Sequence, residues 1–413
     1  MIMPKLAKIR QSFNNEHIAD IEGTVKEQIN GLETKIRPGA SIAVAVGSRG
    51  IANLNLIVRA AVGILKEKGA KPFIVPAMGS HGGATAEGQK EVLESYGVTE
   101  EYIGAPVRSS MQTVELPQGS LKTRVFMDRY AYESDGVVVI NRVKLHTDFH
   151  GSTESGLLKM CVIGLGKHKQ ALELHNHGVY GLKELVPETA REVLKSGKIL
   201  MGVGIVENAY DRTMVIRAVL PRDMEKEEIK LLDINRKNMP SFPVKQMDVL
   251  IVDEMGKDIS GIGIDSNITG RIKIRGEQEL SDPDITNIVV TDLTGASHGN
   301  ALGIGLVDFI TKNLYDKIDF KATYENVLTS TFTERAKIPI VAATDSMALE
   351  YALRTCGPVK PDAARIIRIK NTLRLNELYV SKPVLDEVKA YENIEVAGDF
   401  TDIFDSCGKL VEF

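Results

Sequence analysis

The sequence predicts an α/β protein with two domains, each built around a largely parallel β-sheet. The chain has 413 residues, which is enough for two hydrophobic cores of ordinary size. In both halves, short apolar runs that end in polar or glycine-rich turns alternate with segments of helical periodicity. Between the halves, residues 235–246 are mostly polar and contain two prolines, which is typical of a linker. The expected domains are therefore 1–240 and 245–413, with the active site in the cleft between them.

The strands and helices are expected to alternate along both domains. In the N-terminal domain, helices are predicted over 53–69 and over 85–98, where apolar residues repeat at helical spacing and Thr85 is a suitable N-cap. Strands are predicted in the apolar runs that a polar turn closes, at 41–50, 71–83, 134–146 and 197–208. The C-terminal domain repeats the pattern, with strands in 247–265 and 285–305 and a strand and helix in 338–357.

Composition and charge narrow the class of protein. With 43% apolar and 26% charged residues, the chain has the balance of a soluble globular protein. It has 51 basic and 55 acidic residues, and a net charge of −4 gives no reason to expect nucleic-acid binding. Neither a signal peptide nor an apolar run long enough to span a bilayer is recognised, which predicts a cytoplasmic protein without a membrane partner. Cys161, Cys356 and Cys407 are too far apart for a disulfide framework or a metal knuckle.

Histidine is concentrated in one stretch of the chain. Five of the eight histidines lie between Val143 and Gly178, at His146, His150, His168, His175 and His177. Imidazole is a common metal ligand and exchanges protons near neutral pH, so this stretch is expected to hold a metal or an acid/base site. The alternative is a chance cluster on a solvated face. Asp148 and Glu154 can complete a zinc site with His146 and His150, although no conventional spacing specifies one.

A second signal comes from the ends of the predicted strands, where parallel sheets bind their ligands. Arg49 follows the first strand, His81 follows the next, and His146 follows a third. His81 by itself is as well explained as a turn histidine that bonds to its own loop. Together with His146, however, it is expected to face a common substrate, one histidine acting as base and the other as acid.

The lysines of the glycine-rich stretch 156–169 leave two interpretations open. Backbone N–H groups and the ammonium groups of Lys159, Lys167 and Lys169 can converge on a phosphate or another anion. The alternative for Lys167 and Lys169 is a solvated helix start. The stretch is neither a Walker motif nor the dinucleotide fingerprint. From these residues alone, the prediction is an active site lined by histidine and lysine.

The order of these elements resembles the nickel-dependent lactate racemase family. The resemblance covers most of the chain and is clearest from Ser41 to Gly178. The matching pieces, in chain order, are VGSRG with Arg49, GSHGGATAEG with His81, KLH with His146, SGLLK with Lys159 and ELH with His175. Each piece is weak alone, and the ordered set is fairly specific.

This resemblance implies a racemase-type domain that binds nickel in a pincer made from pyridinium-3,5-bisthiocarboxylic acid mononucleotide. Cofactor-maturation enzymes would then be partners of the protein. By the resemblance, Lys159 attaches the cofactor covalently, Lys167 and Gly156 lie against it, and His175 is the protein's ligand to nickel. The two bases implied are His81 and His146, with His150 as the alternative for the second.

The sequence also departs from the family pattern, which argues against lactate as the substrate. The acidic residue expected just before the Arg49 turn is absent, and leucines precede Lys159. A different 2-hydroxy acid or a sugar acid is therefore expected, bound by Arg49, His298 and Asn300. The competing hypotheses are a nicotinamide-dependent oxidoreductase, which the missing fingerprint disfavours, and a non-catalytic metal- or nucleotide-binding protein. The oligomeric state is left open.

Overall fold

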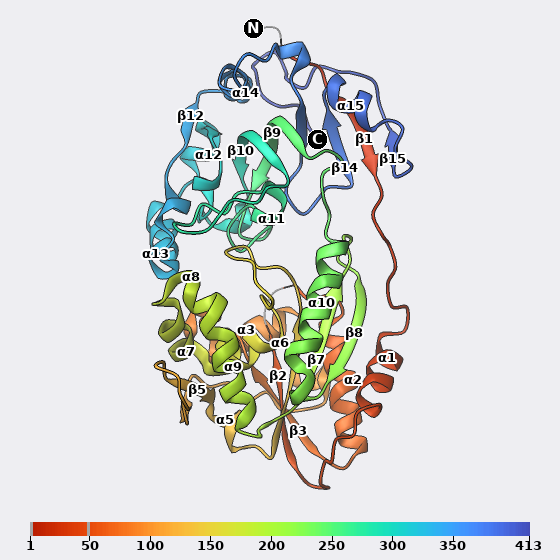
Figure 1. Cartoon of the computed structure of the whole chain (residues 1–413), viewed down its shortest axis with the longest axis vertical. Coiled ribbons are helices and arrows are strands. Elements are labelled where there is room, and N and C mark those ends of the chain that lie inside the picture. Colours follow the sequence, from red (N-terminus) through yellow and green to blue (C-terminus); the bar gives the residue numbers. More distant parts are fainter. Residues whose placement is uncertain (1–2, 48–49) are drawn as a thin grey trace. The chain divides into compact units, whose positions relative to one another are not determined.

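The structure is a computed structural model that describes residues 3–47 and 50–413, and it divides into two compact units (Figure 1). The N-terminal unit is Asn14–Met239. The C-terminal unit is Pro240–Phe413 together with the N-terminal strand β1 (Ala7–Gln11). Each unit has its own sheet and its own buried core, and helices alternate with mostly parallel strands in both. The predicted α/β class is confirmed.

The N-terminal unit contains a five-stranded sheet in the order β3-β2-β6-β7-β8. Its strands are β2 (Ser41–Val46), β3 (Lys71–Pro76), β6 (Gly136–Arg142), β7 (Ile199–Glu207) and β8 (Thr213–Val219). All neighbours are parallel except β7 and β8, which are antiparallel. Almost every residue of β2 and β3 is buried, as expected for parallel strands that helices cover on both faces.

Two layers of helices bury the two faces of this sheet. On one face, α1 (Ile21–Asn30) and α2 (Leu54–Glu67) pack against alternate residues of β2. The opposite face is covered by α6 (Leu157–Lys159), the π-helical turn η2 (Met160–Gly164), α7 (Leu165–His175) and α9 (Val186–Lys195). The second layer contains most of the stretch that is rich in histidine and lysine.

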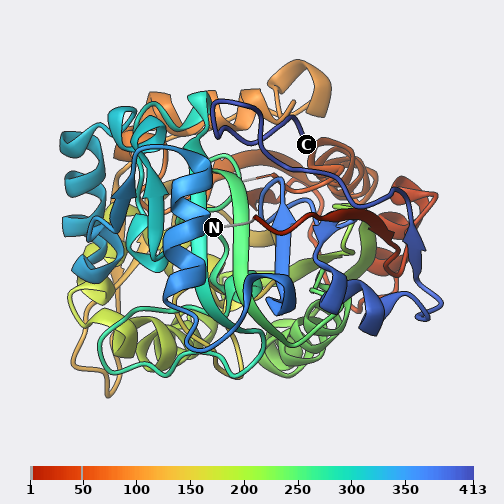
Figure 2. The same cartoon turned by 90° about the horizontal axis from the view of Figure 1, so that it is seen from above.

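The C-terminal unit contains an eight-stranded sheet in the order β12-β11-β10-β9-β13-β14-β1-β15 (Figure 2). Its strands after β1 are β9 (Gln246–Met255), β10 (Asp284–Leu293), β11 (Phe309–Thr311), β12 (Ile340–Ala342), β13 (Ile366–Ile369), β14 (Glu377–Val380) and β15 (Ile394–Val396). The first five strands of the order are parallel, and the last three join antiparallel.

The remaining α-helices and one β-hairpin complete the two units. In the N-terminal unit they are α3 (Ala86–Ser95), α4 (Glu100–Ile103), α5 (Arg129–Glu133), α8 (Gly178–Tyr180), α10 (Met224–Asn238) and the hairpin of β4 (Thr113–Leu116) and β5 (Val125–Asp128). In the C-terminal unit they are α11 (Ser266–Thr269), α12 (Lys312–Asp316), α13 (Phe320–Ser330), α14 (Asp345–Arg354) and α15 (Lys382–Val388). As predicted, Thr85 caps α3, its hydroxyl accepting from the N–H of Gly88 at 3.0 Å.

The linear division of the chain needs one correction. The first strand, β1, does not pair within the N-terminal unit. It pairs with β14 and β15, so that Ile9 lies opposite Leu378 and Val396. Strand pairing is a long-range contact, and nothing within the five residues of β1 specifies its partners. The linker is also shorter than the polar stretch 235–246, because α10 continues to Asn238 and β9 begins at Gln246.

Candidate functional site

The predicted residues of the N-terminal unit gather beyond the carboxyl ends of its parallel strands. His81 follows β3 and His146 follows β6, and β2 lies between these two strands in the sheet. The two histidines therefore come from strands on either side of β2 and not from neighbouring strands. Both side chains are half-buried. Arg49, the predicted carboxylate-binding residue, lies outside the described residues.

His146 and Lys159 are in direct contact. The Nζ atom of Lys159 lies 2.6 Å from Nε2 of His146. On the other side of the ring, the backbone N–H of Asp148 donates to Nδ1 at 3.1 Å, and the ring stacks on Phe149 with centroids 4.7 Å apart. The imidazole is therefore held along its face and at both nitrogens, which fixes its orientation beside the lysine.

The loop that carries His146 is closed on itself. Lys144 and Ser155 pair through two backbone hydrogen bonds, which bring the two ends of the loop together. Inside the loop, the buried carboxylate of Glu154 accepts from the backbone N–H of His146 at 2.6 Å and from that of Gly151 at 3.2 Å. Its Oε1 atom also lies 3.2 Å from Nδ1 of His150. His150 is thus bound to the loop's own carboxylate, whereas His146 contacts the lysine.

His175 lies near enough to Lys159 and Asp148 for their charges to affect its pKa. It is the last residue of α7 and is half-buried. Burial lowers the pKa of its imidazole, the charge of Lys159 lowers it further, and Asp148 acts in the opposite direction. The neutral imidazole, which is the form that binds metals, is therefore favoured at neutral pH. His177, the other member of the HxH pair, is exposed beyond the end of the helix.

Lys167 differs from both interpretations offered by its sequence. It is fully buried, and its backbone φ is +58°, a left-handed value that breaks the path of α7. Its ammonium group donates to the carbonyl oxygen of Pro76 and to Oε1 of Gln89 at 3.0 Å, and it forms an ion pair with Asp128 at 3.4 Å. The solvated helix start is wrong for Lys167. Its neighbour Lys169 is exposed.

This buried lysine also supports the loop that carries His81. The side-chain amide of Gln89, itself fully buried, donates to the carbonyl oxygens of Gly79 at 2.9 Å and His81 at 3.2 Å. Because Lys167 holds the oxygen of the same amide, a chain of hydrogen bonds links α7 to the backbone of His81. Sequence patterns do not reveal this function, because Gln89 resembles any polar residue of an amphipathic helix.

Gly156 has a packing reason of its own. A Cβ atom at this position would lie 2.4 Å from the carboxyl carbon of Glu228, which is fully buried. The carboxylate of Glu228 accepts from the backbone N–H of Leu158 at 2.8 Å, at the start of the helix that carries Lys159. Burial raises the pKa of Glu228 to about 7. Glu228 thus caps the Lys159 helix through a side chain that titrates near neutrality.

This raised pKa predicts a pH-dependent stability. Between pH 4.5 and pH 7, Glu228 is protonated in the folded state and ionised in the unfolded state, so unfolding releases a proton. The free energy of unfolding is therefore highest below pH 4.5 and falls as the pH rises from 4.5 through 7. We expect Glu228→Gln to gain about 3 kcal/mol of unfolding free energy relative to wild type between pH 4.5 and pH 8. Urea unfolding across this range measures the difference. Glu227→Gln, which removes the same charge one position away, is the control, and parallel pH profiles for the two variants would contradict the prediction.

The two residues predicted from the C-terminal half lie on the loop after β10. His298 is exposed and has a left-handed φ of +47°. Asn300 donates to Oδ1 of Asn326 at 3.2 Å, and Lys257 donates to the same oxygen at 2.7 Å. Lys257 is thus a cationic neighbour of Asn300 that the sequence did not indicate. Substrate binding by His298 and Asn300 stays a prediction.

Within 3–47 and 50–413, no three histidine, cysteine or acidic side chains are grouped so as to hold a metal ion. In the same part of the chain, no helix is long and apolar enough to cross a membrane.

Comparisons with known proteins define the fold to which this site belongs. Residues 47–242 match a family described as a domain of unknown function, DUF362. No curated protein matches the chain. Among solved structures, the chain is similar to the lactate racemase apoprotein from Thermoanaerobacterium thermosaccharolyticum, with a TM-score of 0.51 and 11% sequence identity. The similarity covers 89% of this chain and 99% of that chain. At this identity, it shows a shared fold.

Proposed function

We propose that the protein is a racemase or epimerase that inverts the carbinol carbon of a 2-hydroxy acid or a sugar acid, using a nickel-pincer pyridinium cofactor. The observation that carries the proposal is the 2.6 Å contact between Lys159 and His146, with His175 close enough to feel the charge of the lysine. The fold shared with a lactate racemase supports the same conclusion.

The residues present fit this cofactor. His175 favours the neutral imidazole, and one such donor suffices for a metal whose other donors belong to the cofactor. Lys159 is near His175 and is the residue for covalent attachment. When bound, the pincer supplies a metal-bound pyridinium ring that accepts and returns a hydride. Lys167, in contrast, is engaged by Pro76, Gln89 and Asp128, so we assign it a positioning role and not direct contact.

The contact with His146 places an imidazole nitrogen beside the Nζ atom of Lys159. Covalent attachment would require the lysine to lose its proton, and the neighbouring ring is placed to exchange protons with it. An uncharged amine has a free lone pair and is the nucleophilic form of lysine. This arrangement suits a lysine that becomes covalently attached to a thiocarboxylate.

Two histidines of the chain would transfer the proton of the substrate hydroxyl, one for each enantiomer. Once Lys159 is attached to the cofactor, Nε2 of His146 would exchange a proton with the substrate hydroxyl. His81, on the loop that Gln89 and Lys167 support, is the second acid/base group and serves the opposite enantiomer. Arg49 remains our candidate for holding the substrate carboxylate. His150 stays the alternative second base, because Glu154 at its Nδ1 orients the imidazole and its Nε2 has no hydrogen-bond partner among the described residues.

The test is nickel retention in protein co-expressed with the enzymes that make the cofactor. We expect His175→Ala to lose its nickel and His177→Ala, the matched control from the exposed position, to keep it. The peptide that contains Lys159 should also carry the cofactor mass in the wild type and lose it in Lys159→Ala. Full nickel in His175→Ala, or wild-type protein with neither nickel nor an adduct, would overturn the proposal.

A further inference from the structure

Helix α10 has two polar residues on the face that it buries. Its buried residues are Met224, Glu228, Leu231, Leu232 and Asn235, so the inward stripe is apolar except at Glu228 and Asn235. These two residues are separated by about two helical turns, which places them on the same face and about 10 Å apart along the axis. Burying a polar group is unfavourable unless it is hydrogen-bonded, so both side chains need a partner.

The carboxamide of Asn235 holds the loop of His146. Its Oδ1 atom accepts from the backbone N–H of Leu145 at 2.9 Å, and Leu145 directly precedes His146 in the chain. Apolar contacts support the same segment, because Leu231 of α10 belongs to one buried cluster with Val143 and Leu145. The backbone that leads into the histidine is therefore fixed to α10 by a hydrogen bond and by packing.

The carboxyl group of Glu228 holds the helix of Lys159 in the same way. It accepts from the backbone N–H of Leu158 at 2.8 Å, and Leu158 directly precedes Lys159. The chain at Gly156 lies directly against this group, since a Cβ atom there would be 2.4 Å from its carboxyl carbon. One face of α10 thus holds the backbone immediately before each member of the contacting lysine and histidine pair.

The helix that makes both contacts is itself seated closely on the sheet. It packs against β7 and α6 (Figure 1). Two glycines of β7 leave the necessary room, because a Cβ atom at Gly202 would lie 2.9 Å from Cε of Met224 and one at Gly204 would lie 2.6 Å from Cδ1 of Leu231. An α-helix packed in this way is a rigid spacer, so its two hydrogen bonds fix the separation of the segments that they hold.

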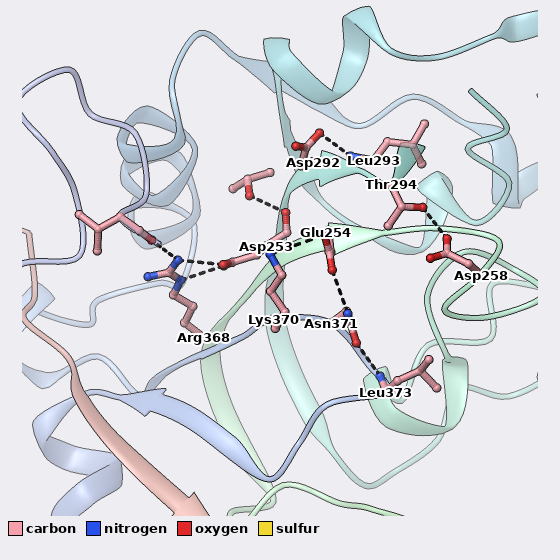
Figure 3. Close-up of polar contacts among 12 residues, drawn as sticks. Asp253, Glu254, Asp258, Asp292, Leu293, Thr294, Arg368, Lys370, Asn371 and Leu373 are labelled. Carbon is pink, nitrogen blue, oxygen red and sulfur yellow. Dashed lines mark hydrogen bonds and ion pairs between the residues drawn. The ribbon is translucent and has the colours of Figure 1, made fainter. Parts of the chain in front are cut away.

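A polar cluster at the carboxyl ends of β9 and β13 provides a contrast. There, Arg368 donates to both carboxylate oxygens of Asp253 at 2.8 Å, and Asn371 donates to Glu254 at 3.0 Å (Figure 3). In these contacts one side chain satisfies another. The two polar residues of α10 instead satisfy backbone groups beside residues of the candidate site, which is the pattern of a support for that site.

We propose that Glu228 and Asn235 are positioning residues that set the distance between Lys159 and His146. Each acts through the backbone N–H that precedes its target, so neither is a catalytic residue. What each position requires is an oxygen acceptor of the right reach, and charge is not needed. The importance of this distance for racemisation rests on the proposed function, whereas the positioning itself is testable without nickel, cofactor or substrate.

The test is the rate at which acetic anhydride labels Lys159 in the whole chain, measured by mass spectrometry. Because Nε2 of His146 lies 2.6 Å from the amine, His146→Ala should change this rate at least about fivefold in the wild-type background. In Glu228→Leu or Asn235→Leu, the same substitution should change the rate by less than about twofold, since residues that no longer touch act independently. Glu228→Gln and Asn235→Asp keep the acceptor and should keep the wild-type coupling.

Other lysines of the chain control for folding. Lys167 is fully buried and should stay unlabelled in every variant that keeps its fold, whereas the exposed Lys169 reports the activity of the reagent. Lys237→Leu, an exposed substitution on α10, should keep the coupling. If Asn235→Leu exposes Lys167 to the reagent, Asn235→Ala removes the acceptor without adding bulk and takes its place.

The proposal is overturned if the coupling survives in either leucine variant while Lys167 stays protected, if Glu228→Gln or Asn235→Asp loses it, or if His146→Ala leaves the wild-type rate unchanged. Activity assays separate this result from the proposed function. Asn235→Leu should lower kcat about tenfold or more with little change in KM, and wild-type kcat despite lost coupling would also overturn the proposal. Lost coupling in a chain that racemises no hydroxy acid would contradict the proposed function alone.

Discussion

Lys167→Ala is expected to lower the unfolding free energy of the N-terminal unit by about 3–5 kcal/mol. The substitution leaves Asp128 as a buried carboxylate without its cation, since both side chains of this 3.4 Å ion pair are fully buried. Burial already lowers the pKa of Lys167 and raises that of Asp128, so neither group is easily accommodated alone. The carbonyl of Pro76 and the amide of Gln89 also lose a donor. Urea unfolding measures the loss.

The matched control is Lys169→Ala, two positions along the chain. Lys169 is exposed and lies over the ring of Phe126, a contact worth about 1 kcal/mol or less. The double variant Lys167→Met with Asp128→Asn removes both charges and should recover part of the lost stability, because no unpaired charge then remains buried. Equal losses for Lys167→Ala and Lys169→Ala would mean that the buried pair contributes little.

His146→Ala is expected to slow racemisation by about 10²–10⁴-fold, the range for removal of a positioned acid/base group. The ring is fixed by Phe149, by the N–H of Asp148 and by Lys159, and alanine removes the only atom of this residue that can exchange the proton. Under the proposed function, both directions should slow, because the overall equilibrium is unchanged. The measurement is loss of optical rotation with each enantiomer of the hydroxy acid that a substrate panel identifies.

His150→Ala is the matched control for this prediction. Under our assignment of the second base to His146, loss of His150, whose Nδ1 bonds to Glu154 within the loop, should slow the reaction much less than His146→Ala does. Nickel content should be measured in both variants, so that a lost cofactor is not mistaken for a lost base. If His150→Ala is slow and His146→Ala is not, the second base is His150 and our assignment is wrong.

Local patterns were enough to predict the class of fold and the region of the candidate site. Buried parallel strands need runs of apolar residues, and β2, β3 and β6 show such runs within six or seven residues each. The cap at Thr85 depends on a contact only three residues away. That His146 follows a strand is likewise a local property. The contact between Lys159 and His146 lies within the histidine-rich stretch in which the sequence predicted a site.

What the sequence determined by itself is therefore what short-range physics encodes: periodicity, turns and caps, and the crowding of imidazole into one segment. The tertiary structure alone decided which charged groups are buried and what they meet. Lys167 and Glu228 are charged residue types that are usually solvated, and each is fully buried beside a partner distant in sequence, Asp128 for Lys167 and the Leu158 N–H for Glu228. The pairing of β1 and the hydrogen bond of α10 to Leu145 have the same origin. Their contacts join segments far apart in the chain, and the free energy of such contacts depends on the whole packing and not on any local pattern.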